Sequence, residues 1–420
     1  MRFLYSFILY LLTPVVILRL VWQGRDSIDY LKRWKERFGF IPVNKISNCV
    51  IWIHAVSVGE IQAARPLINL LFRYYPDHVI VVTTTTLTGA RILKQHYGNK
   101  IVHYYFPYDL PGVIKRFIRR LAPKLLIILE TEIWPNLIHF CHVNSIPIAL
   151  VNARMSELSA KKYKRLLRLT QSTIKKIDII SAQSDLDAER FVELGADNEK
   201  IHNSGNLKFD IETTASIKEK GHLIRQKFSP HRPVWIAAST HPGEEELLLQ
   251  VFSKVLSRIP DCLLVIVPRH PERANNIQTL CNRNNFNSIC KSREQAYGST
   301  TSIFILDTLG ELPAYYSASD VAFVGGSLVP VGGHNLLEPA SLGLPIITGP
   351  YLFNFSEISQ ALCNIEVAWI IGDLNGIANK VIELLLDAEL RLDAGDKGRK
   401  FVQSNIGNAN KTLNLISNLL

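Results

Sequence analysis

The sequence predicts an α/β protein with two doubly wound, Rossmann-like domains that face a cleft. Short apolar runs alternate with amphipathic stretches over almost all of its 420 residues, a pattern typical of parallel sheets covered by helices on both faces. One polar stretch, 212–232, interrupts the alternation and divides it into two blocks. Polar and glycine-rich motifs follow several apolar runs, at the strand ends where such sheets bind ligands.

The strands expected in the first block are Val50–His54, Val79–Thr84, Ile101–Phe106, Leu125–Glu130, Pro147–Asn152 and Asp178–Ala182. Those expected in the second block are Val234–Ala238, Leu263–Pro268, Ser302–Leu306, Val321–Val324, Pro345–Thr348 and Val367–Ile371. Helical patterns such as Ile61–Tyr74 separate most of them. We therefore expect an N-terminal domain over 25–215, a linker over 216–232 and a C-terminal domain over 233–420. The final helical segment, 388–420, is expected to pack back across the cleft.

Composition narrows the classes of partner. The net charge of +10 points to an acidic partner: nucleic acid, anionic lipid or a phosphorylated substrate. The six cysteines show no C-x-x-C spacing, so neither a zinc ribbon nor a disulfide framework is expected. There is no Walker A loop and no G-x-G-x-x-G fingerprint, which weakens ATPase and dehydrogenase interpretations.

The N-terminal segment favours lipid over nucleic acid. Residues Phe3–Trp22 form a nearly unbroken apolar run, long enough to span a bilayer as a helix. Basic residues crowd after it, at Arg25, Lys32, Arg33, Lys35 and Arg37. The positive-inside rule then predicts a single-pass anchor over 1–24, with the body of the protein on the cytoplasmic side and near anionic lipid. The alternative is a helix that packs within the fold.

The most informative stretch runs from Val324 to Pro350. An apolar strand ends in Gly325 and Gly326, and such turns let backbone N–H groups approach a phosphate. Asn335 and Glu338 lie three residues apart at a predicted helix start, so they share one face. An amide and a carboxylate there suit the hydroxyls of a sugar ring, but they are equally consistent with a capping box.

Three charged residues of the first block lie at candidate ligand positions. Glu60 is in the first turn of a helix after a strand, where an acid complements the macrodipole or serves as a base. Glu130 ends an apolar strand and therefore needs a partner or a role. Lys208 is either an ordinary surface lysine or a ligand for phosphate or carboxylate.

In the second block, Arg269 follows Pro268 at a strand end and suits an oxyanion, because its fork binds bidentately. Leu309, Gly310 and Glu311 form a turn whose N–H groups suit a phosphate; the alternative is a plain turn. Asp185 and Asp187 resemble a metal motif, but Ser184 before them favours helix capping. We therefore expect no bound metal and no cofactor.

Nine motifs in order along the chain resemble the Kdo transferase family, the 3-deoxy-D-manno-octulosonic acid (Kdo) transferases of lipopolysaccharide assembly. They are RWKERFGF, HAVSVGE, TTTTLTGA, ETEIWPNL, VNARMS, GNLKFD, PRHPER, LGEL and GGHNLLEPA, and they run from Arg33 to Ala340. Each motif is weak alone, whereas the ordered set is highly specific.

The resemblance implies a GT-B glycosyltransferase that uses CMP-Kdo as donor, and a tetraacylated, bisphosphorylated lipid A precursor (lipid IVA) as acceptor. By motif match, Glu60 is the proton acceptor of an inverting reaction, and Glu130 and Lys208 stabilise the transition state. The residues implied to bind the CMP part are Pro268, Arg269, Leu309, Gly310, Glu311, Asn335, Leu336, Leu337 and Glu338.

Two alternatives remain open at this point. One is a different GT-B enzyme that transfers from a UDP-sugar to a lipid, which donor choice would distinguish. The other is a membrane-attached protein that binds sugar nucleotide or anionic lipid without catalysis, which donor turnover would exclude.

Overall fold

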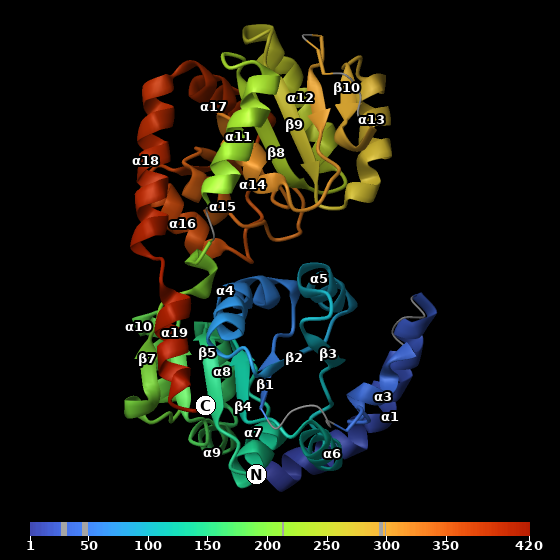
Figure 1. Cartoon of the computed structure of the whole chain (residues 1–420), viewed down its shortest axis with the longest axis vertical. Helices are drawn as coiled ribbons and strands as arrows, with labels where there is room; N and C mark the ends of the chain where they lie inside the picture. Colours follow the sequence, from blue (N-terminus) through green and yellow to red (C-terminus); the bar gives the residue numbers. More distant parts are fainter. Residues whose placement is uncertain (27–31, 44–48, 212–213, 294–296, 299) are drawn as a thin grey trace. The chain divides into compact units, whose positions relative to one another are not determined.

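The computed structural model describes residues 1–420 except 27–31, 44–48, 212–213, 294–296 and 299; of residues 19, 21 and 23–26 it describes the backbone only. The chain divides into two compact units. The first unit comprises Met1–Asp210 and Gly407–Leu420, and the second comprises Ile211–Ile406. Each unit is a parallel seven-stranded sheet with helices on both faces (Figure 1).

The sheet of the first unit has the strand order β3-β2-β1-β4-β5-β6-β7. Its strands are β1 (Val50–His54), β2 (Val79–Thr84), β3 (Val102–Tyr105), β4 (Leu125–Leu129), β5 (Ile148–Ala153), β6 (Ile179–Ala182) and β7 (Ile201–Asn203). The central strands β1 and β4 are buried along their whole length. Burial on both faces explains their uninterrupted apolar sequence.

Helices cover both faces of this first sheet. One face packs on α6 (Pro111–Leu121), α7 (Pro135–Val143), α8 (Glu157–Lys164), α9 (Leu167–Ile174) and α10 (Asp185–Glu193). The other packs on α4 (Val58–Tyr74), α5 (Leu87–Tyr97) and the last helix of the chain, α19 (Asn408–Ser417). Short helices α3 (Trp34–Arg37), η1 (Asn198–Lys200) and η2 (Leu207–Phe209) complete the unit.

The sheet of the second unit has the order β10-β11-β9-β8-β12-β13-β14. Its strands are β8 (Val234–Thr240), β9 (Leu263–Pro268), β10 (Ser288–Cys290), β11 (Ile303–Ile305), β12 (Val321–Val324), β13 (Ile346–Thr348) and β14 (Ala368–Ile370). Its helices are α11 (Ala215–Phe228), α12 (Glu244–Arg258), η3 (Pro271–Arg273), α13 (Ala274–Arg283), η4 (Lys291–Arg293), α14 (Leu312–Ser317), α15 (Leu337–Leu342), α16 (Ser356–Asn364), α17 (Leu374–Leu386) and α18 (Ala388–Ser404).

All strands expected from apolar runs are present, which confirms the α/β, doubly wound architecture. Two short edge strands, β7 and β10, were not expected, because each has only three residues and carries polar side chains. The stretch 216–232 is not a linker. It contains most of α11, which packs against α14 within the second unit.

The predicted spanning anchor over 1–24 requires a correction. The segment forms one helix, α1 (Arg2–Asp26), with Pro14 inside it. Within the described residues, no helix is both long enough and apolar enough to cross a bilayer. Two polar residues of this helix contact the rest of the first unit: the Tyr5 hydroxyl donates to Asp109 (3.0 Å), and the buried Ser6 hydroxyl donates to Asn136 (3.0 Å).

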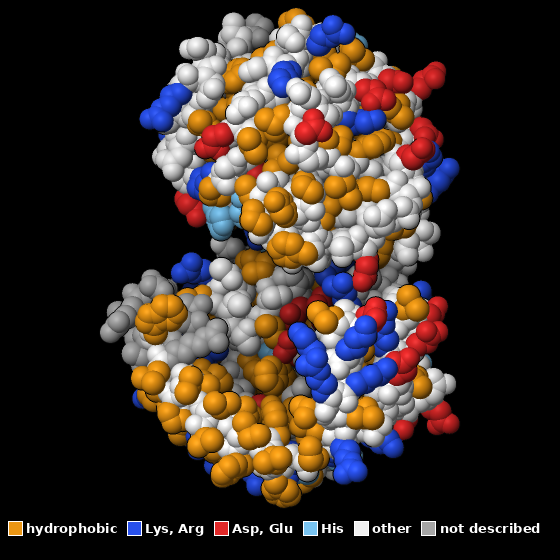
Figure 2. All heavy atoms as spheres, turned by 180° about the vertical axis from the view of Figure 1, so that it is seen from behind, with side chains coloured by type: hydrophobic (Ala, Val, Ile, Leu, Met, Phe, Trp, Pro, Cys, Tyr) orange, Lys and Arg blue, Asp and Glu red, His pale blue; other side chains and the backbone are white. Residues whose placement is uncertain are grey.

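The rest of α1 exposes apolar side chains. The most exposed of them are Phe3, Phe7, Leu11, Leu18 and Trp22. Figure 2 shows hydrophobic side chains crowded over this part of the first unit. Of the basic cluster expected after the helix, the side chain of Arg25 lies outside the described residues, whereas Arg37 is buried and donates to the Thr85 carbonyl (2.8 Å).

Candidate active site

Glu60 lies at the carboxyl end of β1, in the first turn of α4. Ser57 caps this helix by accepting a hydrogen bond from the Glu60 N–H, and its hydroxyl donates to Glu60 Oε1 (3.1 Å). The backbone N–H of Val56 donates to Glu60 Oε2 (2.7 Å). These bonds fix the carboxyl group, whose side chain is 8% exposed. The position of Glu60 in the first turn of the helix agrees with its interpretation as an acid that complements the macrodipole, and it is compatible with a role as base.

Burial raises the pKa of Glu60 to about 8, and the negative charge of Glu130 adds to the rise. The hydrogen bond from Val56 acts in the opposite direction but does not cancel it. A carboxyl group with a pKa near the working pH is suited to proton transfer, since it can both hold and release the proton.

Glu130 follows β4, the strand next to β1 in the sheet. Its backbone φ of 56° lies in the left-handed region, a strained conformation that is frequent at functional sites. The Lys208 ammonium lies 3.3 Å from Glu130 Oε1, and both side chains are only partly exposed. The structure thus brings Glu130 and Lys208 into contact, and the charge of Glu130 acts on Glu60.

Two further residues lie beside this cluster, Asn152 and His54, and of these the sequence analysis missed Asn152. Asn152, opposite Glu130 on β5, has a φ of 54° and is fully buried. Its Oδ1 accepts from the Leu207 N–H (2.9 Å), which fastens the short helix that carries Lys208. His54 stacks on Phe106 (3.8 Å between ring centres), and burial lowers its pKa to about 3, so it is neutral. The sequence signal that could have identified Asn152 is a polar residue at the end of an apolar strand.

In the second unit, Arg269 follows Pro268 at the end of β9, and its backbone N–H donates to the Thr240 carbonyl (3.0 Å). Its guanidinium has no ion-pair partner within the described part of the chain. Beside it, His241 and His334 stack with Nε2 atoms 2.9 Å apart. Burial, with the charge of Arg269, lowers the pKa of His334 to about 3. Neutral histidines and a half-buried arginine form a polar surface that suits an oxyanion.

The glycine-rich turn after β12 does not serve as predicted. The backbone N–H groups of Gly326, Ser327 and Leu328 donate to the carboxylate of Glu244 at 2.7, 2.9 and 2.9 Å. The N–H of His241 donates to the same carboxylate (2.9 Å), and Glu244 is fully buried. An internal carboxylate thus occupies the place expected for a phosphate, and Glu244 is a site residue that the sequence analysis missed.

The other predicted CMP-binding residues lie on two turns of the second unit. Leu309 is exposed, Gly310 has a φ of 84°, and Glu311 pairs with Lys291 and accepts from the Thr308 hydroxyl. Leu336 and Leu337 are fully buried, so only their backbone can contact a ligand. Asn335 Oδ1 accepts from the Leu337 N–H (3.0 Å), but the N-cap of α15 is Leu336 and no side chain caps the helix, so the predicted capping box is not formed.

The Asp185–Asp187 motif is a helix cap. Ser184 caps α10, and Asp187 accepts from the Ser184 hydroxyl (2.6 Å) and from the Met155 N–H (2.7 Å). Within the described residues, no group of three His, Cys, Asp or Glu side chains is arranged to hold a metal ion.

The fold is shared with solved sugar-nucleotide enzymes. A UDP-GlcNAc 2-epimerase from Neisseria meningitidis bound to UDP-GlcNAc has a TM-score of 0.58 at 13% identity, over 88% of this chain and 99% of that one. A glycosyltransferase from Rickettsia africae has a TM-score of 0.56 at 15% identity, over 89% and 99%. The two parallel α/β units thus have a GT-B-like fold.

Sequence comparison gives the family. Residues 32–211 match the family described as 3-deoxy-D-manno-octulosonic-acid transferase (kdotransferase), and residues 244–401 match glycosyl transferases group 1. The 3-deoxy-D-manno-octulosonic acid transferase of Haemophilus influenzae is 38% identical over 99% of this chain and 98% of its own length. That of Rickettsia bellii is 32% identical over 96% of both. The chain belongs to the Kdo transferase family and is an enzyme of the glycosyltransferase class.

Proposed function

We propose that this enzyme transfers Kdo from CMP-Kdo to a hydroxyl of a lipid A precursor with inversion of configuration, as a step of lipopolysaccharide assembly. The observation that carries this proposal is the buried Glu60, held by Val56 and Ser57 with a pKa near 8 beside the Glu130–Lys208 pair. Family membership supplies the nature of the sugar.

In this mechanism, ionised Glu60 removes the proton of the acceptor hydroxyl. The hydroxyl oxygen forms a bond to the anomeric carbon of Kdo while the bond from that carbon to the CMP phosphate oxygen breaks. The electron pair leaves with CMP, and Glu60 keeps the proton until it is released to solvent. Lys208, positioned by Glu130 and by the Asn152-anchored turn, offsets negative charge on the reacting groups.

The donor is assigned to the second unit. Arg269 supplies a guanidinium for the phosphate, and the stacked His241 and His334 supply neutral ring nitrogens. Asn335 and Glu338 are assigned to ribose or cytosine, because their polar side chains lie at the start of α15. Because these positive and polar groups come from the chain itself, the proposal needs neither a metal nor another cofactor.

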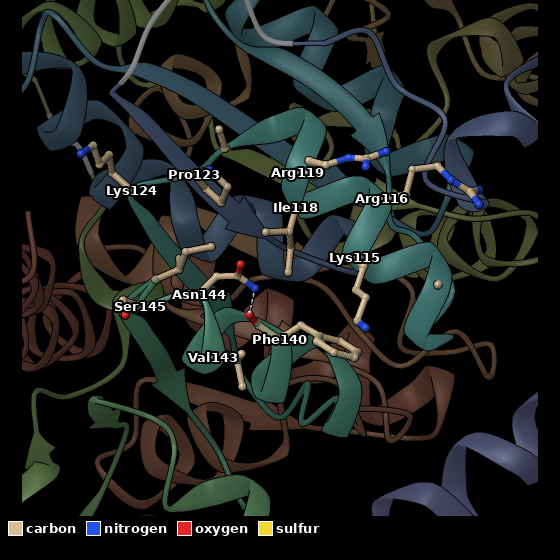
Figure 3. A pocket seen from close by; sticks show the side chains of 13 residues that line it. Lys115, Arg116, Ile118, Arg119, Pro123, Lys124, Phe140, Val143, Asn144 and Ser145 are labelled. Carbon is tan, nitrogen blue, oxygen red and sulfur yellow. Dashed lines mark hydrogen bonds between the residues drawn. The ribbon is translucent and has the colours of Figure 1, made fainter.

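Placement at the cytoplasmic face of the inner membrane is part of the same proposal. The exposed apolar side chains of α1 suit a lipid surface. A groove of about 1080 Å³ between α6 and α7 borders this helix, because the Gly112 N–H donates to the Tyr10 hydroxyl and Arg2 lies over Phe140. Basic side chains line the groove: Lys115, Arg116, Arg119 and Lys124 (Figure 3). Their charge favours anionic headgroups.

The test is incubation with CMP-Kdo and a lipid A precursor, followed by mass spectrometry of the lipid. A mass increase by one or more Kdo units, with release of CMP, is the expected result. Parallel reactions with UDP-sugars are the control for donor class. Consumption of a UDP-sugar with no use of CMP-Kdo contradicts the proposal, and turnover of neither donor contradicts it as well.

A further inference from the structure

Trp134 stands between two cavities next to the candidate catalytic residues. It lies in the loop after β4, four residues beyond Glu130. Its indole N–H donates to Glu132 Oε2 (2.8 Å), and its ring packs against Phe106 with ring centres 5.6 Å apart. The indole ring is thus held at two ends, and it contributes to the lining of both cavities.

The first cavity, of about 470 Å³, lies between the loop 131–135, α8 and α9. Its walls include Ile133, Leu166 and Leu169, and Tyr5 of α1 contributes to its lining. Lys162 also lines this cavity, and its ammonium has no ion-pair partner within the described residues. We call it the α9 pocket.

The second cavity, of about 300 Å³, lies between α1 and the loop after β3. Val16 and Leu20 of α1 line it, together with Phe106 and Tyr108. Buried Asp109 also lines it and ties α1 to the first unit through the Tyr5 hydroxyl. We call it the α1 pocket.

The linings decide which ligand the two cavities suit. They are of the size of small-ligand sites, and most of the surface that lines each of them is apolar. Polar residues interrupt it: Glu132, Lys162 and several Ser and Thr side chains in the α9 pocket, and Arg37, Thr85 and Asp109 in the α1 pocket. Such surfaces favour hydrocarbon and disfavour sugar or nucleotide. Both cavities share walls with α1, whose remaining face is exposed and apolar. The loop that carries Glu130 continues directly into the wall of the α9 pocket.

We infer that the α9 pocket and the α1 pocket bind hydrocarbon chains of the lipid acceptor, one on each side of Trp134. The inference rests on the proposed function in that the acceptor is a lipid. In this arrangement Trp134 separates the chains, and Lys162 meets a phosphate of the same lipid at the rim of the α9 pocket. The acceptor is then held by its chains with its hydroxyl close to the loop that carries Glu130.

A direct test measures occupancy without catalysis. The emission of Trp134 is taken as the difference between wild type and Trp134→Phe, and a dibrominated fatty acyl lipid in detergent micelles serves as quencher. The expected result is quenching of this difference signal, because bromine atoms on the chain would lie against the indole ring. A difference signal that the brominated lipid leaves unchanged, while the emission of the other tryptophans is quenched, overturns the inference.

A kinetic test fills each pocket. Ser159→Phe places a ring in the α9 pocket and Val16→Phe one in the α1 pocket. The matched controls are Leu158→Phe and Val15→Phe, which alter exposed neighbours outside both linings. Each filled pocket should raise KM for the acylated acceptor by roughly tenfold for every two methylenes it displaces, leave CMP affinity unchanged, and have little effect on a deacylated acceptor. The control variants should behave as wild type.

The outcomes separate this inference from the proposed function. If the brominated lipid quenches Trp134 and either Ser159→Phe or Val16→Phe abolishes this quenching, the result supports the pockets even if no Kdo is transferred. Normal Kdo transfer with an unchanged KM in both filled variants contradicts the pockets and leaves the proposed function intact. If both variants lose Kdo transfer to the acylated and to the deacylated acceptor equally, the pockets are also contradicted. Such a result indicates general damage to the loop that carries Glu130.

Discussion

Replacement of Glu60 by Gln tests the proposed base by two independent quantities. The substitution keeps the size of the side chain, and its amide oxygen can still accept from the Val56 N–H while its NH₂ group donates to the Ser57 hydroxyl. It cannot accept a proton from the acceptor. Loss of a general base typically costs ~10²–10⁴-fold in rate, so Kdo transfer should fall by that factor.

The second quantity is stability, and its sign follows from the pKa. Burial raises the pKa of Glu60 from 4.5 to about 8. The folded state then binds more protons than the unfolded state between these values, so Glu60 lowers the free energy of unfolding as pH rises from 4.5 to about 8. At about 1.4 kcal/mol per unit, the penalty in wild type reaches at most about 5 kcal/mol. Glu60→Gln avoids it and should be more stable above pH 8.

The assay combines transfer kinetics from pH 6 to 9 with thermal unfolding at the same values. Wild-type kcat should rise with pH as Glu60 ionises, with a midpoint near pH 8. The residual activity of Glu60→Gln should not show this rise with pH. Exposed Glu199→Gln in the same unit is the control and should match wild type. Near-normal turnover of Glu60→Gln, or a rise with pH that persists in it, would refute the assignment of the base.

Three other predictions concern the second unit and the chemistry. Glu244→Gln places an NH₂ group against two backbone N–H donors, which costs about 1–3 kcal/mol for each donor left unpaired. Thermal unfolding should show lower stability, and calorimetry should show weaker CMP binding. Unchanged values for both would contradict a role of Glu244 in holding the turn. Glu338→Ala should weaken CMP binding by about 1.5–3 kcal/mol, since a hydrogen bond to its carboxylate is lost; unchanged affinity in a folded variant would leave it as a helix-start residue only. Activity should persist in excess EDTA, because Arg269 and Lys208 are assigned the charge compensation; loss on chelation that Mg²⁺ restores would refute this assignment.

The fold was predictable because its signal is local and repeated. Each buried parallel strand requires an apolar run, and each covering helix requires an amphipathic stretch, so alternation alone predicts the layers. Edge strands β7 and β10 lack this signal because they are short and partly polar. The linker over 216–232 was wrong for a related reason: α11 is polar on most of its surface and buries little beyond Gly221 and Phe228.

The spanning prediction for α1 shows what hydropathy omits. A nearly unbroken apolar run has the length of a bilayer span, but the few polar side chains within it determine how the helix packs. Tyr5 and Ser6 reach partners on α7 and on the loop before α6, and these partners, Asp109 and Asn136, lie more than one hundred residues away in sequence. No local pattern contains that contact.

The candidate site also combines features that local sequence patterns indicate with features that depend on contacts between distant residues. The positions of Glu60, Glu130 and Lys208 left structural interpretations open, and their roles were inferred from the motif resemblance. Their mutual effects depend on strand order, which places β1 beside β4. Asn152 was missed because its role depends on a φ of 54° and on a bond to a turn fifty-five positions later. A residue that positions a charged neighbour through a hydrogen bond to the backbone has no characteristic pattern in a single sequence.

The turn after β12 shows why a sequence can predict the geometry of a site without predicting its ligand. Two glycines after a buried strand predict a concave set of backbone N–H groups that favours negative charge, and the structure contains that set. The sequence does not indicate which anion fills it, because the same geometry suits a phosphate and a carboxylate equally. In this structure Glu244, eighty-two residues before Gly326, fills it. In the proposed function the donor phosphate is therefore bound by side chains, and Arg269 and two neutral histidines lie at the adjacent strand ends.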